Sequence, residues 1–289
     1  MKFLELFGRL KSVVIGMIHV RALPGSPLGC LKMSQIVEEA FREAEVYRDA
    51  GVDGLIVENM HDVPYTFHVG PEVCACMTSV CAAVRRACPS LPLGVQILSA
   101  ANRQALAVAL ASGLDFIRAE GFVFSHVADE GLLNACAGDL LRYCRQIGAE
   151  HVQIFTDIKK KHSAHALTSD VTMEETARAA KFFLSDGVIL TGAATGDPAD
   201  PRQLTGNQAP PTQPPVDDSS FCLSLVVFES LTPQSSKAFE ITQESLQNNV
   251  HLIGKYRPQC IASELFVIEK YVCKLIFKNV FIIRKSLNS

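Results

Sequence analysis

The most constraining feature of this sequence is the regular alternation of short apolar runs with longer amphipathic stretches. Six runs of strand length recur along the first two thirds of the chain, at residues 13–20, 54–58, 93–98, 116–121, 152–158 and 187–191. They are almost entirely apolar, which is typical of parallel strands that are covered on both faces. The alternation therefore predicts a parallel sheet with helices packed around it.

The stretches between the runs carry the signals of helix ends. Ser34 is expected to cap one helix, which stops before Gly51, and Asn102 is expected to cap another. Thr172 and Glu175 have the spacing of a capping box. The five predicted helices cover residues 34–50, 71–88, 102–113, 131–147 and 172–186.

Two architectures contain such an alternation, an open doubly wound sheet and a closed eight-stranded barrel. An open sheet that binds nucleotides usually has a glycine fingerprint after its first strand. Residues 19–27 contain no such fingerprint. Polar residues follow nearly every apolar run, and barrel enzymes place their chemistry at this end of their strands. The sequence therefore favours an α/β fold, a TIM-type (β/α)8 barrel.

The barrel pattern stops near Leu204. A proline-rich polar run at 207–215 is typical of a linker, and no seventh or eighth β/α unit follows it. Residues 221–228 are compatible with one strand, and 261–283 with one helix or an aggregation-prone segment. We expect an incomplete barrel over 1–204 and a partly helical or irregular tail over 205–289. The first and sixth strands would then have exposed edges, unless the run at 221–228 covers one of them.

The composition narrows the classes of function. The net charge of −3 offers no basic excess for a nucleic-acid partner. No stretch of about 20 uncharged apolar residues suggests a membrane span. The N-terminus does not have the pattern of a signal peptide, so a cytoplasmic protein is expected and an organellar one is left open. Cys74, Cys81 and Cys88 lie seven apart, which favours a buried helical stripe over a zinc site.

Four charged or titratable residues end four of the predicted strands, and they are the candidate catalytic residues. His19 suits acid–base work, and Arg118 suits a carboxylate or a phosphate. Glu58 and Asp157 are candidates for acid–base work or for holding a divalent cation, the one cofactor the sequence suggests. For each residue the alternative is a structural role, such as an ion pair of Arg118 with Glu58 or Asp157.

Further polar residues near the same strand ends are candidate substrate-binding residues. They are Asn59, Gln96, Lys159, His162, Thr191 and Gly192. Hydrogen bonds within the barrel or within a solvated loop are the alternatives. Glu120 shares a strand face with Arg118 and is left without a role. Lys160 and Lys161 are expected in a solvated loop.

Seven groups of residues match one known family in order and spacing. They are 11–19 with 23–27, 53–59 with 62–65, 94–98, 116–118, 140–145, 155–158 with 161–162, and 191–192 with 195–196. Between Leu6 and Leu204 the chain thus resembles the BtpA/SgcQ family. This resemblance implies a barrel of the ribulose-phosphate-binding kind. Family members usually continue into a seventh and an eighth strand, where such barrels commonly hold a phosphate.

The resemblance also frames the function. The family's naming member is linked to the accumulation of photosystem I, and the family's reaction is unassigned. We expect an enzyme that acts on a small anionic substrate containing a sugar or a phosphate. A non-enzymatic assembly or stability factor is the alternative. The abrupt change after Leu204 leads to the hypothesis of a truncated, inactive isoform, and the sequence leaves a homo-oligomer open.

Overall fold

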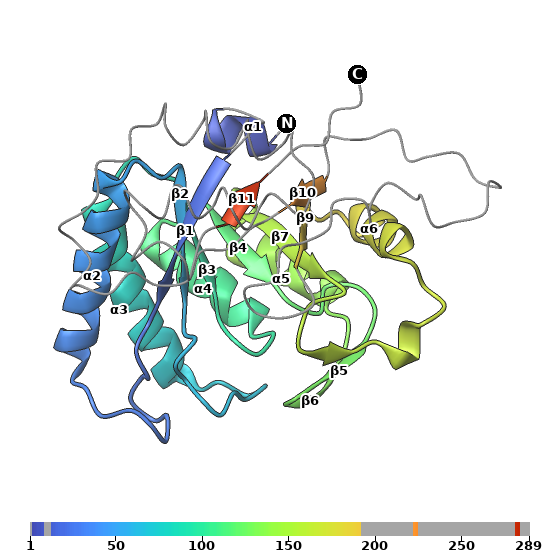
Figure 1. The fold of residues 1–289 in the computed structure, drawn as a ribbon, viewed down its shortest axis with the longest axis horizontal. Coiled ribbons are helices and arrows are strands. Elements are labelled where there is room, and N and C mark those ends of the chain that lie inside the picture. The colour runs from blue at the N-terminus through green and yellow to red at the C-terminus, as the bar shows by residue number, and fades with distance from the viewer. Residues whose placement is uncertain (1, 9–12, 192–221, 225–280, 284–289) are drawn as a thin grey trace, which may run out of the picture.

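The computed structural model describes residues 2–8, 13–191, 222–224 and 281–283, and the six predicted strands form one parallel sheet within them (Figure 1). Their order across the sheet follows their order along the chain, as in a barrel. The strands are β1 Val13–His19, β2 Gly54–Glu58, β3 Leu93–Gln96, β4 Phe116–Ala119, β7 Gln153–Ile158 and β9 Gly187–Leu190. The parallel β/α architecture predicted from the apolar runs is confirmed.

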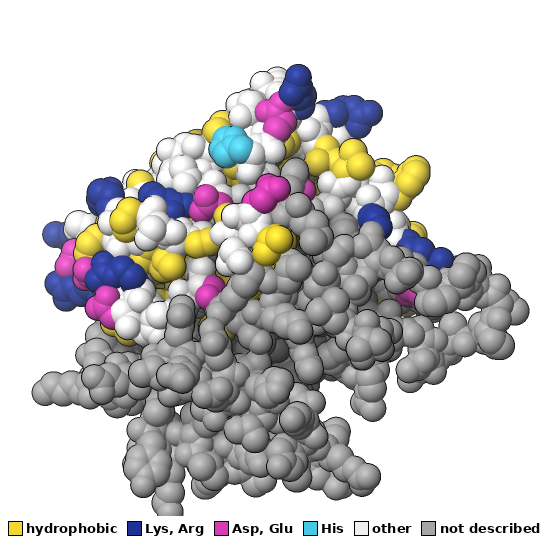
Figure 2. All heavy atoms as spheres, turned by 90° about the horizontal axis from the view of Figure 1, so that it is seen from above, with side chains coloured by type: hydrophobic (Ala, Val, Ile, Leu, Met, Phe, Trp, Pro, Cys, Tyr) yellow, Lys and Arg dark blue, Asp and Glu magenta, His cyan; other side chains and the backbone are white. Residues whose placement is uncertain are grey.

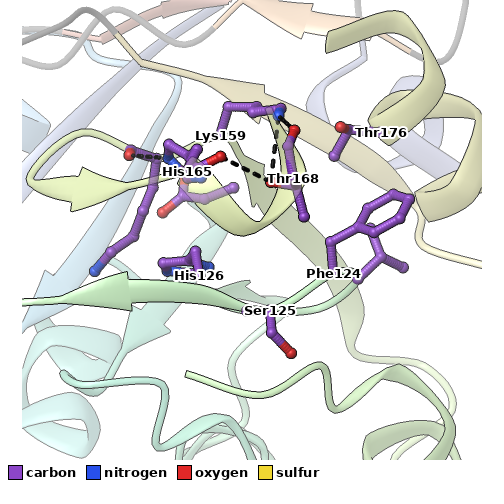
Figure 3. Close-up of a pocket in the computed structure, with 11 residues that line it drawn as sticks. Phe124, Ser125, His126, Lys159, His165, Thr168 and Thr176 are labelled. Carbon is purple, nitrogen blue, oxygen red and sulfur yellow. Dashed lines mark hydrogen bonds between the residues drawn. The ribbon is translucent and has the colours of Figure 1, made fainter. Parts of the chain in front are cut away.

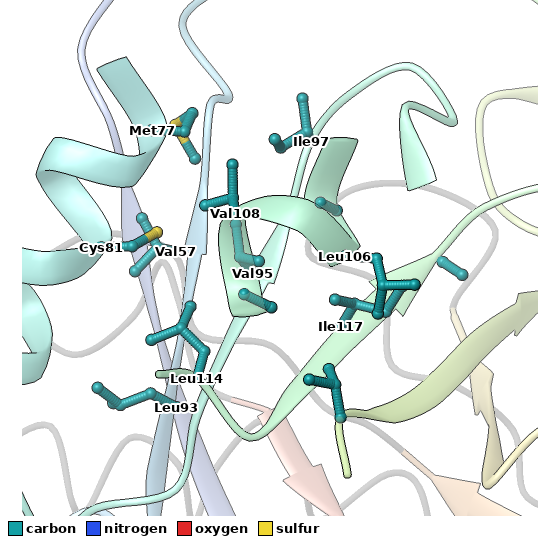
Figure 4. Close-up of a cluster of buried hydrophobic side chains, with 14 of the residues drawn as sticks. Val57, Met77, Cys81, Leu93, Val95, Ile97, Leu106, Val108, Leu114 and Ile117 are labelled. Atoms are coloured by element: carbon teal, nitrogen blue, oxygen red, sulfur yellow. The ribbon is translucent and has the colours of Figure 1, made fainter. Parts of the chain in front are cut away.

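Five helices follow these strands and cover the outer face of the sheet. They are α2 Met33–Asp49, α3 Pro71–Ala87, α4 Asn102–Ser112, α5 Ala137–Ile147 and α6 Met173–Phe182. Figure 4 shows how Met77 and Cys81 of α3 pack against Val57 of β2, while Leu106 of α4 lies near Ile117 of β4. The apolar runs therefore supply one wall of a core, and the helices supply the other.

The inner face of the curled sheet contains a second, separate core. Alternate residues of the strands face inward, and at the amino end of the sheet they are apolar, among them Met17, Ile56 and Phe155. A short helix, α1 Lys2–Phe7, closes this end with Phe3 and Phe7. The sequence analysis did not identify α1, because six residues are too few for a helical period to be visible.

Two short strands flank the six parallel ones. β10 Cys222–Ser224 pairs in parallel with β9, and β11 Phe281–Ile283 pairs antiparallel with β1. The strand considered at 221–228 is therefore present at three residues, where it pairs with the sixth strand. The expectation that the outer edges of the first and sixth strands would be exposed is wrong where β11 pairs with β1 and where β10 pairs with β9. A helix through 261–283 is wrong at residues 281–283, while the linker at 207–215 lies outside the described residues.

The predicted helix at 131–147 begins six residues too early. Residues Gly131–Leu133 form strand β6, which pairs with β5 His126–Ala128. β5 also pairs with β8 Ser163–Ala164, so that these three strands make a second small sheet. A 3-10 helix, η1 Ala166–Thr168, follows β8. The loops after β4 and β7 are thus joined by backbone hydrogen bonds.

Of the three predicted N-terminal caps, one is confirmed and two are wrong. Thr172 caps α6 as predicted, because its hydroxyl accepts a hydrogen bond from the Glu175 backbone N–H at 3.1 Å. Ser34 does not cap α2, since Lys32 occupies that position. Asn102 lies inside α4, and its side chain donates instead to the backbone carbonyl of Glu120. That contact ties the start of α4 to the end of β4.

Candidate functional site

The first buried pair at the carboxyl end of the sheet is His19 with Glu58. The two residues are register partners on β1 and β2. The Nε2 atom of His19 lies 3.1 Å from Oε2 of Glu58, and both side chains are nearly excluded from solvent. Burial raises the pKa of Glu58. The hydrogen bond from His19 and the nearby positive charges together lower it by more than burial raises it, so the pKa lies below its ordinary value. Glu58 is therefore a carboxylate.

The second buried pair is Arg118 with Asp157, on the neighbouring strands β4 and β7. The Nε and Nη2 atoms of Arg118 donate to Asp157 at 3.0–3.2 Å and use both carboxylate oxygens. Burial alone lowers the pKa of Arg118, but the carboxylates of Asp157, Glu58 and Glu120 raise it above its usual value. The guanidinium stays charged and is held in one orientation by its fork-shaped contact.

The third pair, Glu120 with Lys160, was not predicted. The Nζ atom of Lys160 lies 2.9 Å from Oε1 of Glu120, and only 11% of the lysine side chain is exposed. The second oxygen of Glu120 accepts a hydrogen bond from the Ala100 backbone N–H at 2.8 Å. The prediction of a solvated loop is therefore wrong at Lys160. A charged residue after a strand does not reveal in sequence whether its loop folds back over the barrel.

The three pairs form one group. Glu58 and Arg118 act electrostatically on each other, as do Arg118 and Glu120. The four candidate catalytic residues, His19, Glu58, Arg118 and Asp157, thus converge on the inner face at one end of the sheet. Their chemical roles stay predictions. Both oxygens of Asp157 contact Arg118.

Three of the candidate substrate-binding residues lie beside this group in different settings. The carbonyl oxygen of the Gln96 side chain is buried without a hydrogen-bond partner in the described parts of the chain, next to Glu58 in register. Asn59 contacts the Leu98 backbone and Asp62, so it shapes a loop. The hydroxyl of Thr191 accepts a hydrogen bond from the backbone N–H of Lys161 at 3.1 Å. Of the three residues, Gln96 has a hydrogen-bond acceptor that a substrate could use.

The other candidates are spread more widely. The Nζ atom of Lys159 donates to the backbone carbonyl of Thr168 at 2.7 Å. His162 is exposed on the same loop. Both residues have a left-handed backbone, with φ of 46° and 54°, which L side chains rarely adopt and which recurs at functional loops. Gly192 lies outside the described residues.

A pocket adjoins the group on the side of β7 (Figure 3). It encloses about 330 Å³, a volume that includes its open mouth. His126 of β5 and His165, just after β8, line it with their ring centroids 5.4 Å apart. Nothing in the sequence indicates that these two histidines lie together, because the pairing of β5 with β8 is not visible in a single sequence. Asp157, Lys159 and Lys160 also line the pocket.

A divalent cation is not supported by the arrangement of the ligating side chains. Within residues 2–8 and 13–191, no three His, Cys, Asp or Glu side chains are grouped closely enough to hold a metal ion. Glu58 is hydrogen-bonded to His19, and Asp157 to Arg118. We therefore derive no chemical step from a metal.

On the face that Figure 2 draws, the described surface is neither predominantly charged with one sign nor predominantly apolar. Acidic and basic side chains are intermixed there, with apolar ones between them. Among the residues that the structure describes, no helix is long and apolar enough to cross a bilayer.

Known proteins resemble roughly the first two thirds of this chain. The model of the BtpA family matches residues 10–213. The chain is 53% identical over 205 residues to an uncharacterized mitochondrial protein of Caenorhabditis elegans, covering 69% of this chain and 74% of that protein. It is 34% identical over 192 residues to the photosystem I biogenesis protein BtpA of Synechocystis, covering 66% of each.

Solved structures are more distant. One is 2,3-dimethylmalate lyase, with 13% identity and a TM-score of 0.41, matched over 66% of this chain and 61% of that one. A similarity this weak carries no information on function.

Proposed function

The chain belongs to the BtpA family, and we propose that it is an enzyme that acts on a small anionic substrate at the carboxyl end of its sheet. The proposal rests on one observation. Two ion pairs and one hydrogen-bonded histidine–carboxylate pair are buried at the carboxyl end of the sheet, where apolar side chains could stand instead. A buried ion pair stabilises a fold little or not at all, compared with apolar side chains of similar volume. Charges retained in such a place are therefore best explained by chemistry.

In the proposed site, His19 is the group that transfers a proton. Its Nε2 atom is held by the carboxylate of Glu58, which fixes the orientation of the ring. Glu58 acts through His19. A carboxylate whose pKa lies below its ordinary value is a poor proton acceptor but a good partner for an imidazolium ring.

Arg118 is proposed to bind the negative charge of the substrate. A guanidinium held by Asp157 is pre-oriented, so it loses little side-chain freedom when an anion binds. The side-chain oxygen of Gln96 has no hydrogen-bond partner among the described residues and is next to Glu58 in register, so it could accept a hydrogen bond from a substrate hydroxyl. Together these groups suit a polyhydroxy compound that carries an acid group.

The test is a binding screen followed by turnover. The full chain would be melted in the presence of sugar phosphates, sugar acids and the uncharged parent sugars. We expect only anionic compounds to raise the Tm, and Arg118→Met to abolish that rise. Conversion of any compound that binds would then be followed by NMR. His19→Gln and Glu58→Gln should bind it and fail to convert it.

The matched control is Glu38→Gln. Glu38 is exposed and pairs with Arg42 along α2, so binding and conversion should be unchanged. An equal response to charged and uncharged sugars would contradict the proposal. Conversion that survives both His19→Gln and Glu58→Gln would contradict it as well.

The second candidate is an assembly or stability factor for a protein complex. It is favoured by the name of the Synechocystis relative, a photosystem I biogenesis protein. In that case the partner would bind the outer surface of the barrel. Co-purification of a partner that survives simultaneous replacement of His19, Glu58, Arg118 and Asp157 would support this candidate over an enzyme.

A further inference from the structure

The pocket beside β7 contains a buried polar atom that nothing in the described residues satisfies. His126 is 6% exposed, and its Nε2 atom has no hydrogen-bond partner there. Nearly all buried polar atoms in native proteins have a partner, and one without a partner costs free energy. The side chain lines a pocket, so a bound group can supply the missing contact (Figure 3).

The charges around the pocket leave one positive group uncompensated. Asp157 is paired with Arg118, and Lys160 is paired with Glu120. Lys159 forms no ion pair in the described part of the chain, although Asp170 and Glu175 attract it from a distance. Its ammonium group contacts only neutral oxygen atoms of Thr168. The pocket therefore has a net positive charge from Lys159.

His126 is a neutral hydrogen-bonding group in this setting. Burial lowers the pKa of His126 to about 4, and the positive charge of Lys160 and the ring of His165 lower it in the same direction. His165 Nε2 lies 3.0 Å from the backbone carbonyl of Lys160. A carbonyl only accepts, so His165 donates from Nε2. Neutral His126 can likewise place its proton on Nε2, toward the pocket.

The remaining polar side chains have already used their protons. Ser125 donates to the side chain of Asn134, and Thr176 donates to the backbone carbonyl of Thr172. Among the lining side chains that the structure describes, the ammonium of Lys159 and the imidazole of His126 can each donate to a ligand. Two donors and one net positive charge fit a group that accepts hydrogen bonds and carries negative charge.

We propose that this pocket binds one anionic group, a phosphate or a carboxylate, through Lys159 and His126. The location beside β4 and β7 differs from the seventh and eighth strands, where barrels commonly hold a phosphate. Asp157 belongs both to the pocket and to the buried group, so an anion here places the rest of a small molecule beside Arg118. That the anion is part of a substrate rests on the proposed function; anion binding itself does not.

The test measures the binding of simple ions to the full chain by calorimetry at pH 7 and constant ionic strength. Sodium phosphate and sodium acetate are the probes, sodium chloride is the reference, and zinc chloride tests the two histidines as metal ligands. We expect phosphate or acetate to bind. Tighter binding of phosphate would identify a phosphoryl group, and tighter binding of acetate a carboxylate.

Four variants separate this pocket from the rest of the protein. Lys159→Met should weaken anion binding about 10-fold or more, because it removes a charged donor. His126→Phe should weaken it about 5-fold, since one neutral hydrogen bond is lost. Lys181→Met, on the exposed side of α6, should leave it unchanged. Glu58→Gln should also keep the anion, so loss of turnover in that variant is distinguishable from loss of this pocket.

A second measurement avoids variants that fold poorly. A phosphate titration of the unmodified chain, followed through the ¹⁵N signals of the histidine side chains, should shift His126 and His165. The signal of the exposed His151 should stay in place. Binding of neither anion, binding that survives both substitutions, or binding of zinc in preference to both anions would each overturn the proposal.

Discussion

The inward-facing residues at the amino end of the sheet can be compared with those two positions further along the same strands. Met17 on β1 precedes His19, and Ile56 on β2 precedes Glu58. The first member of each pair belongs to an apolar cluster, and the second belongs to the buried charged group. The same change occurs on the two neighbouring strands, where Phe116 precedes Arg118 and Phe155 precedes Asp157.

The difference teaches that position on the strand, and not burial, decides the chemistry. Both ends of the interior are nearly excluded from water. At the amino end, the rings of Phe7, Phe116 and Phe155 pack with centroids 5.4–6.0 Å apart and stabilise the fold. At the carboxyl end, equally buried positions hold opposite charges, which contribute little net stability.

The largest expected effect is at the aromatic end. Phe116→Ala removes a ring that is 1% exposed and leaves a cavity between Phe7 and Phe155. We expect the free energy of unfolding to fall by about 4 kcal/mol, as measured by urea denaturation followed by circular dichroism. Phe182→Ala, which replaces a ring that is 81% exposed, is the control and should have little effect. Similar losses in both variants would remove the contrast between interior and surface.

The charged end should behave differently when its pairs are replaced together. Asp157→Leu leaves the charge of Arg118 buried without its partner and should lower the free energy of unfolding by about 3 kcal/mol. The adjoining pocket admits water, which keeps the loss below that at Phe116. The double variant Arg118→Met with Asp157→Leu should recover most of this stability. A double variant as unstable as the single one would mean that the pair stabilises the fold after all.

A third effect concerns the close contact beneath Phe116. A Cβ atom added at Gly94 would overlap the ring of Phe116, so Gly94→Ala should lower the free energy of unfolding by about 2 kcal/mol. The same change in a Phe116→Ala background should have a smaller effect, because the ring is gone. Gly138→Ala on α5, where the nearest atom is the mobile end of Arg142, serves as the control. If the losses of the two single variants simply add in the double variant, the overlap between the new Cβ atom and the Phe116 ring is not the cause of the effect.

The smallest effect is a dependence of stability on pH from the charged end. The pKa of folded Glu58 lies below its ordinary value of 4.5, so its ionised form stabilises the fold above that pH. This stability should be lost as the pH falls below 4.5 and through the folded pKa. Thermal melts from pH 7 to pH 3 should therefore show a smaller decline in Glu58→Gln than in the unmodified chain. Glu38→Gln should follow the unmodified chain, and an identical decline in all three would contradict the assignment.

The sequence predicted the sheet well because each strand is a local feature. The runs at 54–58 and 187–191 agree with β2 and β9 to within one residue. Because His19, Glu58, Arg118 and Asp157 end predicted parallel strands, the sequence also predicted that they converge. The partner of each charge was less accessible, since Arg118 had two candidate carboxylates, and only the side-chain geometry selects Asp157.

The small sheet and the pocket were not predicted, for a physical reason. β8 has two residues, and its partner β5 is more than thirty residues earlier, so neither has a period of its own. Pairing of such short strands depends on the folded loops around them. His126, His165 and Lys160 therefore looked unrelated in the sequence, although all three line one pocket.

The pairing of β5 with β8 makes the loops after β4 and β7 a single mechanical unit. An insertion or a shortened turn in either loop would change the separation of the two imidazole rings, which now lie 5.4 Å apart. Anyone who transplants this pocket onto another barrel should therefore move both loops together. For the same reason, related barrels with new ligand preferences are expected to differ in both loops at once.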